Sequence, residues 1–180
     1  PGEEVIDEAF FRKYKTMPLA EVIDRTGEIP DQAVALLREH GYLGMRLPAE
    51  FGGGDFDLST YCLALEEFAR SHRVFTLIMD STSGLCPIAI ARSGTLAQKQ
   101  KYVRGLANGT LNASFGLTEP EAGSDAAAIR TRATRGDGGW IINGRKHYIS
   151  GAHRADVVLV VAVTDPAKRA RGGITTFLVD

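Results

Sequence analysis

Cysteine and histidine are scarce in this sequence, and their scarcity argues against several kinds of site. The only two cysteines, Cys62 and Cys86, belong to no CxxC pair and to no Cys/His cluster with the spacing of metal ligands. We interpret both as buried, inert thiols, which suits a reducing compartment. The four histidines show neither HxxxH nor HExxH spacing, so we expect no metal site.

Long apolar runs are missing as well. The run over residues 156–163 has only the length of a strand, and we find no segment long and apolar enough to cross a bilayer. The first four residues lack the basic start and the apolar core of a signal peptide, so no targeting segment is visible. A formal net charge of −1 gives no electrostatic reason to expect nucleic acid or an anionic membrane as a partner.

The chain does contain enough apolar side chains for a core, with 44% hydrophobic and 24% charged residues over 180 positions. Its N-terminal half shows helical periodicity: Leu58, Tyr61 and Leu65 repeat at the spacing of one helix face. Thr95 and Gln98 have the spacing of a capping box. We predict helices over residues 3–15, 31–40, 57–70 and 95–108.

After Gly109 the periodicity changes to two, and β-branched residues become frequent. Asn143-Gly144 is a typical signature of a tight type I′ hairpin turn. We predict strands over residues 111–118, 129–134, 140–142, 146–150, 157–164 and 174–179.

The change near Gly109 predicts an α+β protein with two domains. Residues 1–109 are expected to form a helical domain, and residues 110–180 the first part of a β domain, which stops at Asp180 without a closing strand. The tripeptide RGD at 135–137 spells an adhesion motif, but a hairpin turn explains it better.

The most informative run begins at Phe115 and ends at Asp125, where a strand gives way to a loop. Pro120 forbids further ladder pairing, and Gly123 permits an unusual backbone turn. Successive N–H groups around Gly123 and Ser124 could then form an anion-binding nest suited to a pyrophosphate. On spacing alone, however, an ordinary strand-to-loop turn explains this run better.

Four stretches resemble the acyl-CoA dehydrogenase family, in the order in which that family has them. TEPEAGSD over residues 118–125 is similar to the family signature, and WIINGRKHYISG over 140–151 resembles its strand–turn–strand unit. LPAEFGGG over 47–54 and LEEFA over 65–69 resemble a loop and a helix of its helical domain. Because the similarity is collinear and covers nearly the whole chain, it favours a cofactor loop over a plain turn at 118–125.

The resemblance implies FAD as the cofactor. The implied FAD contacts are Phe115, Leu117, Thr118, Gly123, Ser124, Tyr148, Ile149 and Ser150. Thr118 would face the pyrimidine end of the flavin, Ser124 the pyrophosphate, and Ser150 the N5 atom. Tyr148 stands where the family usually has a tryptophan against the flavin ring, and Phe115 and Ser124 would also contact the substrate.

None of the acids near the motif is implied to be the catalytic base. In the resemblance Glu119 has a structural role and Asp125 belongs to the phosphate loop, while Glu121 replaces a common glycine and is expected to face solvent. The family's base is a glutamate on a C-terminal four-helix bundle, which we expect beyond Asp180. The catalytic residue therefore stays unassigned, and the 180 residues alone are not expected to be active.

By resemblance, the reaction is α,β-dehydrogenation of an acyl-CoA thioester to a trans-2-enoyl-CoA, with electrons leaving through an electron-transfer flavoprotein. The resemblance also implies fatty acid β-oxidation, a homodimer or homotetramer, and a bacterial cytoplasmic or mitochondrial matrix location. Two alternatives remain open: a non-catalytic flavin- or acyl-binding subunit completed by a partner chain, and an acyl-CoA oxidase or flavin monooxygenase of the same fold. Acyl chain length and branching are left open.

Overall fold

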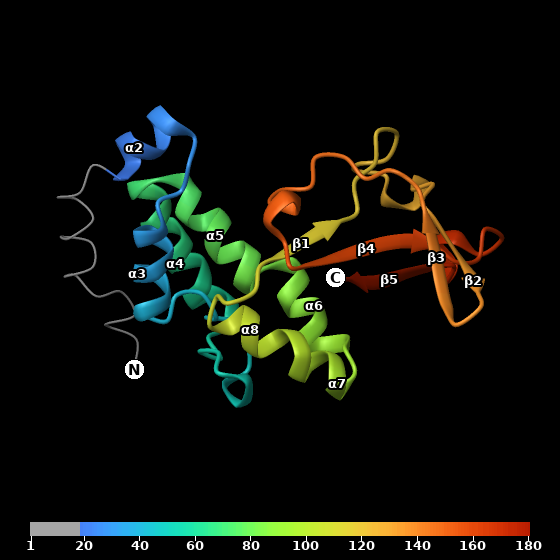
Figure 1. Cartoon of the computed structure of the whole chain (residues 1–180), viewed down its shortest axis with the longest axis horizontal. Coiled ribbons are helices and arrows are strands. Elements are labelled where there is room, and N and C mark those ends of the chain that lie inside the picture. The colour runs from blue at the N-terminus through green and yellow to red at the C-terminus, as the bar shows by residue number, and fades with distance from the viewer. Residues whose placement is uncertain (1–18) are drawn as a thin grey trace. The chain divides into compact units, whose positions relative to one another are not determined.

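The computed structural model describes residues 19–180, and the helix expected over residues 3–15 lies outside them. The chain divides into two compact units between Leu111 and Asn112. The first unit is helical and the second is built on a β-sheet, so the α+β class expected from the sequence is confirmed (Figure 1).

Helices and short 3-10 or π-helical turns make up the regular structure described in the first unit. They are α2 Leu19–Thr26, α3 Asp31–Glu39, η1 Ala49–Phe51, α4 Leu58–Ser71, α5 Arg73–Ser83, α6 Leu85–Ser93, α7 Leu96–Gln98, η2 Lys99–Val103 and α8 Arg104–Ala107. The capping box expected at Thr95 and Gln98 is present, and Asp57 caps α4 by accepting a hydrogen bond from the Thr60 N–H at 2.8 Å. The predicted helices that fall within the described residues are confirmed, the last of them passing through the π-helical turn η2.

Apolar side chains from α3, α4, α5 and the segment after α3 form the core of the helical unit. Phe68 and Phe75 are both buried, and the Tyr42 ring meets the Phe68 ring edge-on, with 4.9 Å between ring centroids. The buried Ser83 hydroxyl of α5 donates a hydrogen bond to the Leu43 carbonyl. The Phe68 and Phe75 rings also lie close together, with 6.2 Å between centroids, and α4 and α5 pack side by side, as Figure 1 shows.

The expectation that no segment is long and apolar enough to cross a bilayer is wrong for the stretch that forms helices α5 and α6. Arg73–Ser93 is a stretch of 21 residues whose most apolar 18-residue window has a mean hydropathy of 1.5, which is long and apolar enough by these two measures to cross a membrane. Half of its most apolar window is buried in the fold, and Gly84 interrupts the stretch with a ψ of −139°. Core helices of soluble proteins pass the same test, so this stretch is only weak support for a membrane span.

The two cysteines differ in exposure. Cys86 is buried in α6, as expected, whereas Cys62 is exposed on α4. The expectation of a buried thiol is wrong for Cys62 because the core face of α4 is set by Tyr61, Ala64 and Phe68. One residue after Tyr61, the helix has turned by about 100°, which carries the side chain away from that face.

Five strands of the described chain form one mixed sheet in the second unit (Figure 1). They are β1 Ala113–Gly116, β2 Arg132–Gly136, β3 Gly139–Asn143, β4 Val157–Val163 and β5 Ile174–Val179, with 3-10 turns η3 Ala126–Ala128, η4 Ala152–Arg154 and η5 Arg169–Arg171. Strand β4 pairs in parallel with β1, where Ala113 lies opposite Val157, and antiparallel with β5. The order is β1-β4-β2-β3, and β2 meets β4 at a single pair, Arg132 and Val163.

The β2–β3 hairpin turns at Asp137-Gly138, with Gly136 opposite Gly139 across the ladder. Gly138 has a φ of +88°, a conformation that glycine adopts without steric cost. The hairpin turn expected around residues 135–137 is therefore confirmed.

Asn143-Gly144 ends β3 and does not form a hairpin turn, so that expectation is wrong. A Cβ at Gly144 would lie 2.6 Å from the Cα of Thr131, which means that glycine is needed here for the close approach of two chain segments. The expected strand over residues 146–150 is also wrong, because this segment is irregular and its hydrogen bonds go to the end of β1 instead of to a ladder.

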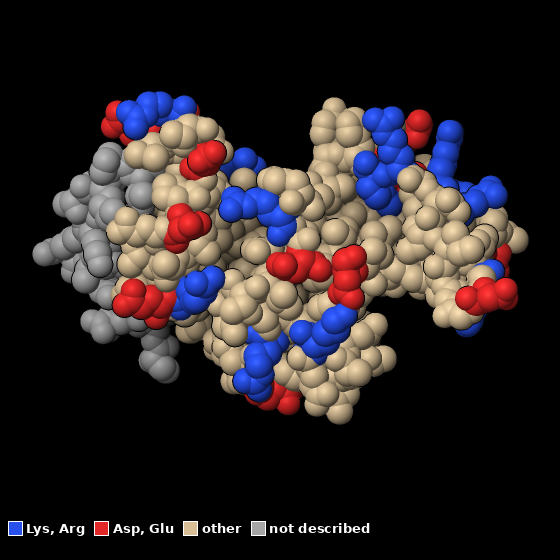
Figure 2. All heavy atoms as spheres, viewed as in Figure 1, with Lys and Arg blue, Asp and Glu red and all other residues tan. Residues whose placement is uncertain are grey.

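Basic and acidic side chains are interspersed over both units on the face shown in Figure 2. This matches the near balance of 21 basic and 22 acidic residues in the sequence.

Candidate functional site

The first motif stretch leaves the sheet at the end of β1. Phe115 lies opposite Leu159 in the β1–β4 ladder, and Thr118 lies beyond the last ladder pair. Glu119 and Ala122 then form a tight bridge, in which the N–H of each donates to the carbonyl of the other at 2.8 and 3.2 Å. The ladder therefore fixes Phe115, while the half-buried residues after Gly116 emerge at the rim of the sheet.

Residues 146–150 lie against the end of β1, where three hydrogen bonds hold them. These bonds run from Lys146 Nζ to the Leu117 carbonyl at 2.8 Å, from the His147 N–H to the Thr118 carbonyl at 2.9 Å, and from Ser114 Oγ to the Ser150 carbonyl at 2.8 Å. The two stretches that the sequence singled out are thus in contact, although 29 positions separate Leu117 from Lys146.

Glu119 lies at the centre of a buried polar cluster. Its carboxylate accepts hydrogen bonds from Lys146 Nζ at 2.8 Å and from the N–H groups of Thr131 and Arg130 at 2.9 and 2.5 Å. Burial alone raises the pKa of Glu119, but these hydrogen bonds more than offset it and hold the pKa at about 2. The Thr131 hydroxyl is buried without a hydrogen-bond partner among the described residues, so it does not contribute to the low pKa of Glu119.

A carboxylate held in this way is a poor general base near neutral pH, because it already accepts three hydrogen bonds and has little affinity for a proton. Instead, the Glu119–Lys146 pair joins the end of β1 to the 146–150 segment and to the start of β2. This arrangement supports a structural role for Glu119.

Tyr148 has an unusual backbone conformation and an exposed ring. Its φ of +55° lies in the left-handed region, which is an outlier for a bulky residue. The side chain is 84% exposed and stacks on the His147 ring, with centroids 3.8 Å apart and planes 13° apart. Strained residues cluster at functional sites, so the exposed aromatic face beside Ile149 and Ser150 is a candidate surface for a flat ligand.

Gly123 and Ser124 lie in an exposed loop between the Glu119 bridge and η3. The expectation that Gly123 supports an unusual turn is wrong, because its φ is not positive and an added Cβ meets no atom within 4 Å. A nest alternates right- and left-handed residues, whereas none of residues 119–128 has a positive φ. Ser124 therefore stays a candidate pyrophosphate contact through its exposed position and its hydroxyl, without a nest.

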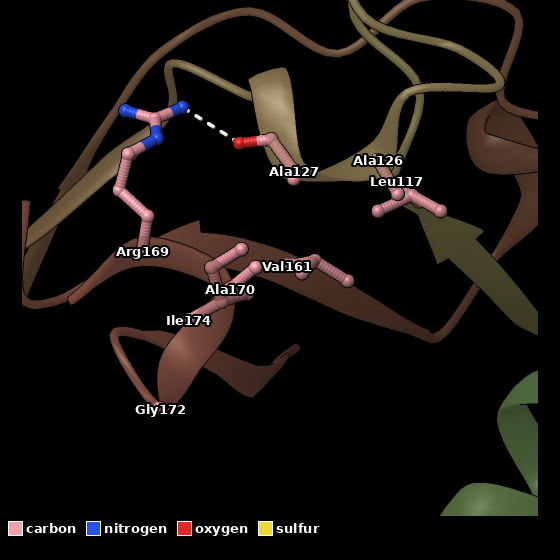
Figure 3. A pocket seen from close by; sticks show the side chains of 8 residues that line it. All are labelled: Leu117, Ala126, Ala127, Val161, Arg169, Ala170, Gly172 and Ile174. Carbon is pink, nitrogen blue, oxygen red and sulfur yellow. Dashed lines mark hydrogen bonds between the residues drawn. The ribbon is translucent and has the colours of Figure 1, made fainter.

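A pocket of about 300 Å³ opens beside Leu117. The residues that line it, mostly apolar, are Leu117, Ala126, Ala127, Val161, Arg169, Ala170, Gly172 and Ile174. The Arg169 guanidinium donates to the Ala127 carbonyl at 2.7 Å, as Figure 3 shows, and to the Ile129 carbonyl at 3.0 Å. Arg169 thus ties together two of the segments that line the pocket, and the pocket places Leu117 beside η3.

Both units match known domain families. Residues 8–110 match the acyl-CoA dehydrogenase N-terminal domain, and residues 114–180 match the acyl-CoA dehydrogenase middle domain. The chain belongs to the acyl-CoA dehydrogenase family. The resemblance inferred from the sequence motifs is therefore confirmed.

Curated relatives of this acyl-CoA dehydrogenase family chain include both dehydrogenases and reductases. It is 37% identical over 170 residues to a 3-(aryl)acrylate reductase from Clostridium sporogenes, and 34% identical over 170 residues to an acyl-CoA dehydrogenase from Bacillus subtilis. Over 171 residues it is 33% identical to the CarC subunit of the caffeyl-CoA reductase–Etf complex from Acetobacterium woodii. Each match covers 94–95% of this chain but 45% of the relative, so the chain spans less than half the length of these proteins.

Solved structures of the family superpose on nearly the whole chain. Butyryl-CoA dehydrogenase from Megasphaera elsdenii, at 32% identity, gives a TM-score of 0.81 over 99% of this chain and 49% of its own. A glutaryl-CoA dehydrogenase from Mycobacterium smegmatis in complex with FADH2, at 30% identity, gives 0.82 over 97% of this chain and 46% of its own. The helices followed by a partial mixed sheet are thus the family's fold.

FAD is the cofactor of the acyl-CoA dehydrogenase family. The side chains at the matching positions suit this group chemically. The exposed Tyr148 ring offers a flat surface for an isoalloxazine ring. Thr118, Ser124 and Ser150 offer neutral hydroxyl donors for polar ring atoms and for a pyrophosphate, and Ser124 and Ser150 are both exposed.

Three residues that hold the site together, Ser114, Lys146 and Arg169, have no role implied by the sequence motifs. Lys146 lies inside a stretch that resembles the family, but its neighbours Arg145 and His147 are polar, so the local pattern gives no sign that its ammonium is partly buried and needs acceptors. Ser114 lies among buried β1 residues, where a hydroxyl also needs a partner. Arg169 gives no such signal, because its partners are backbone carbonyls 40 and 42 positions away.

Proposed function

We propose that this chain forms the flavin- and acyl-CoA-binding part of an FAD-dependent acyl-CoA dehydrogenase. The observation that carries the proposal is the meeting of the two motif stretches at the end of β1, where Tyr148 presents an exposed ring and Ser150 lies exposed. Family membership supports FAD and the oxidoreductase class. The activity of the whole protein and its acyl-CoA substrate are parts of the proposal.

When bound, FAD supplies the acceptor for a hydride from the β-carbon of the thioester. In the proposal, Ser150 donates a hydrogen bond at the flavin N5 atom and Thr118 faces the pyrimidine end. Tyr148 packs against the ring, Ile149 lies beside it, and Ser124 holds the pyrophosphate. Donors that are already in place need little reorganisation when charge develops at the ring, which is how such contacts stabilise a transition state.

The acyl-CoA needs a binding pocket and a base that removes its α proton. We propose that part of the acyl-CoA occupies the pocket beside Leu117 and also contacts Phe115, which lies two residues earlier, in β1. Glu119 is unsuited to remove the α proton, because three hydrogen bonds hold its carboxylate and its pKa is about 2. A glutamate outside residues 1–180 is therefore proposed as the base.

The electron partner is proposed to be an electron-transfer flavoprotein. The similarity to a subunit of a caffeyl-CoA reductase–Etf complex supports this assignment. A role in fatty acid β-oxidation, a homodimeric or homotetrameric state, and a bacterial cytoplasmic or mitochondrial matrix location are proposed from family membership.

The test uses the protein expressed from its complete gene and loaded with FAD. Under anaerobic conditions, acyl-CoAs of several lengths should bleach the flavin absorption band, and enoyl-CoAs should reoxidise the reduced flavin. Both directions are needed because two of the relatives are named as reductases. No retention of FAD, or no spectral response to any acyl- or enoyl-CoA, would contradict the proposal. Rapid reoxidation of the reduced flavin by oxygen would favour an oxidase or a monooxygenase instead.

A further inference from the structure

Ser114 makes a contact that family membership does not assign. Its hydroxyl, in the middle of β1, donates a hydrogen bond of 2.8 Å to the carbonyl of Ser150. Ser114 is 3% exposed, and its backbone lies in the β1–β4 ladder opposite Val158. The donor is therefore held by a ladder on a buried strand.

The acceptor, in contrast, lies in a segment without a ladder. Ser150 follows Tyr148, whose backbone is in the left-handed region, and precedes Gly151, which has a φ of +72°. Nearby hydrogen bonds, such as that from the Ala152 N–H to the Ile149 carbonyl, join residues of the same loop. Among the bonds that tie this segment to β1 and to residues 117–119, the Ser114 bond is the one that ends on Ser150 itself.

We propose that Ser114 is a positioning residue for Ser150, and that its hydroxyl fixes the Ser150 peptide so that the Ser150 side chain is held toward the flavin. This inference rests on the proposed function, in which Ser150 donates to flavin N5. A carbonyl fixed at 2.8 Å restricts the backbone rotation that would swing the Ser150 side chain away. Ser150 lies in an irregular, exposed segment, whereas backbone bonds hold the β1–β4 ladder, so a Ser114→Ala variant loosens the Ser150 peptide and leaves the ladder in place. The change therefore acts on position more than on global stability.

The first experiment needs no flavin. In the FAD-free protein expressed from its complete gene, Ser114→Ala should speed amide hydrogen exchange of Ala152 and Arg154 by about five-fold, the effect of one lost hydrogen bond. The matched control is Ser83→Ala, which removes another buried serine hydroxyl bonded to a distant backbone carbonyl, in the helical unit. It should leave these two amides unchanged. Equal exchange in the Ser114→Ala and unsubstituted proteins would overturn the inference.

The second experiment is a double-mutant cycle in the FAD-loaded protein, read as the midpoint potential of the flavin. Ser114→Ala should shift the potential in the same direction as Ser150→Ala and by less. In the Ser150→Ala background it should cause no further shift, because Ser114 acts through Ser150. The inference would be overturned if Ser114→Ala shifted the potential equally in the unsubstituted protein and in the Ser150→Ala variant. It would also be overturned if Ser150→Ala shifted the potential and Ser114→Ala did not. Either result would leave the proposed function intact. No shift with Ser150→Ala would instead contradict the proposed N5 contact on which the inference rests.

Discussion

In the helical unit, side chains from three helices and from the segment after α3 form one apolar cluster around Phe68 and Phe75. In the β unit, the candidate site depends on a few directed hydrogen bonds, from Ser114, Lys146 and the His147 N–H. Apolar packing gains free energy with buried area and has little directional preference. A hydrogen bond weakens steeply when its geometry changes. The first unit is thus built for stability, and the second uses bonds that also set the direction of nearby side chains.

The largest effect is expected from Phe68→Ala. Because Phe68 is 1% exposed at the centre of the apolar cluster, truncation should lower the free energy of unfolding by about 3–5 kcal/mol. Urea unfolding followed by circular dichroism measures this, with Leu63→Ala as the control because Leu63 is 63% exposed on the same helix. Similar losses for the two variants would contradict the assignment of the core.

Glu119→Gln tests the polar cluster. The folded pKa of about 2 lies below the ordinary value of 4.5, so the stabilisation is complete above that ordinary value and disappears as pH falls through about 2. The variant should lose on the order of 3 kcal/mol at neutral pH. Its stability should change less than that of the unsubstituted protein between about pH 5 and pH 2.

Urea unfolding at a series of pH values measures this difference. Glu121→Gln is the control, because Glu121 is exposed in the neighbouring loop. If the Glu119→Gln variant kept the full acid dependence of the unsubstituted protein, the assigned pKa of Glu119 would be wrong.

Gly144→Ala tests the close approach of two segments beside the same cluster. Its Cβ would lie 2.6 Å from the Cα of Thr131, so we expect a loss of about 1–3 kcal/mol in stability. Gly123→Ala should change stability by less than about 0.5 kcal/mol, because its Cβ meets no atom within 4 Å. Thermal unfolding of both variants decides the comparison, and a Gly123→Ala loss as large as that of Gly144→Ala would contradict it.

The smallest effect is expected from Tyr148→Asn, and it has the opposite sign. Asparagine tolerates the left-handed conformation better than tyrosine does, so stability should rise by up to about 1 kcal/mol. FAD affinity should fall, because the exposed ring is lost. Tyr148→Phe keeps the ring, so it should change neither the stability nor the FAD affinity strongly. If Tyr148→Asn lowered stability and kept FAD affinity, the left-handed backbone of Tyr148 would not be strained and its ring would not contact the flavin.

The elements that the sequence predicts well are those with local signals. Asp57 caps a helix whose buried Tyr61 and Phe68 repeat at helical spacing, and the capping box at Thr95 depends on a residue three positions away. Strand β4 is a continuous run of valine, leucine and alanine, which is typical of a buried central strand. In these cases neighbouring residues alone determine the conformation.

The segment 146–150 has the composition of a strand, and the prediction fails there because its partners are not strand ladders. Its bonds come from or go to Ser114, Leu117 and Thr118, and no local pattern records these contacts. The Gly123 expectation fails for a related reason, because the spacing of a motif does not determine the sign of φ. The family resemblance identified the two stretches, but it did not reveal what holds them together.

Strand β1 is joined to β4 across a long stretch of chain. Asn112 and Asp156, at the start of this pairing, are hydrogen-bonded across 44 positions, whereas β2–β3 and β4–β5 pair strands that follow each other in the sequence. Closing a long loop has a larger entropic cost before any contact forms, so we expect the two hairpins to form first and β1 to dock last. Substitutions at the β1–β4 pairing, such as Val157→Ala, should then mainly speed unfolding and hardly slow folding, which φ-value analysis would measure. The candidate site would be the last part of this unit to form and the first to open.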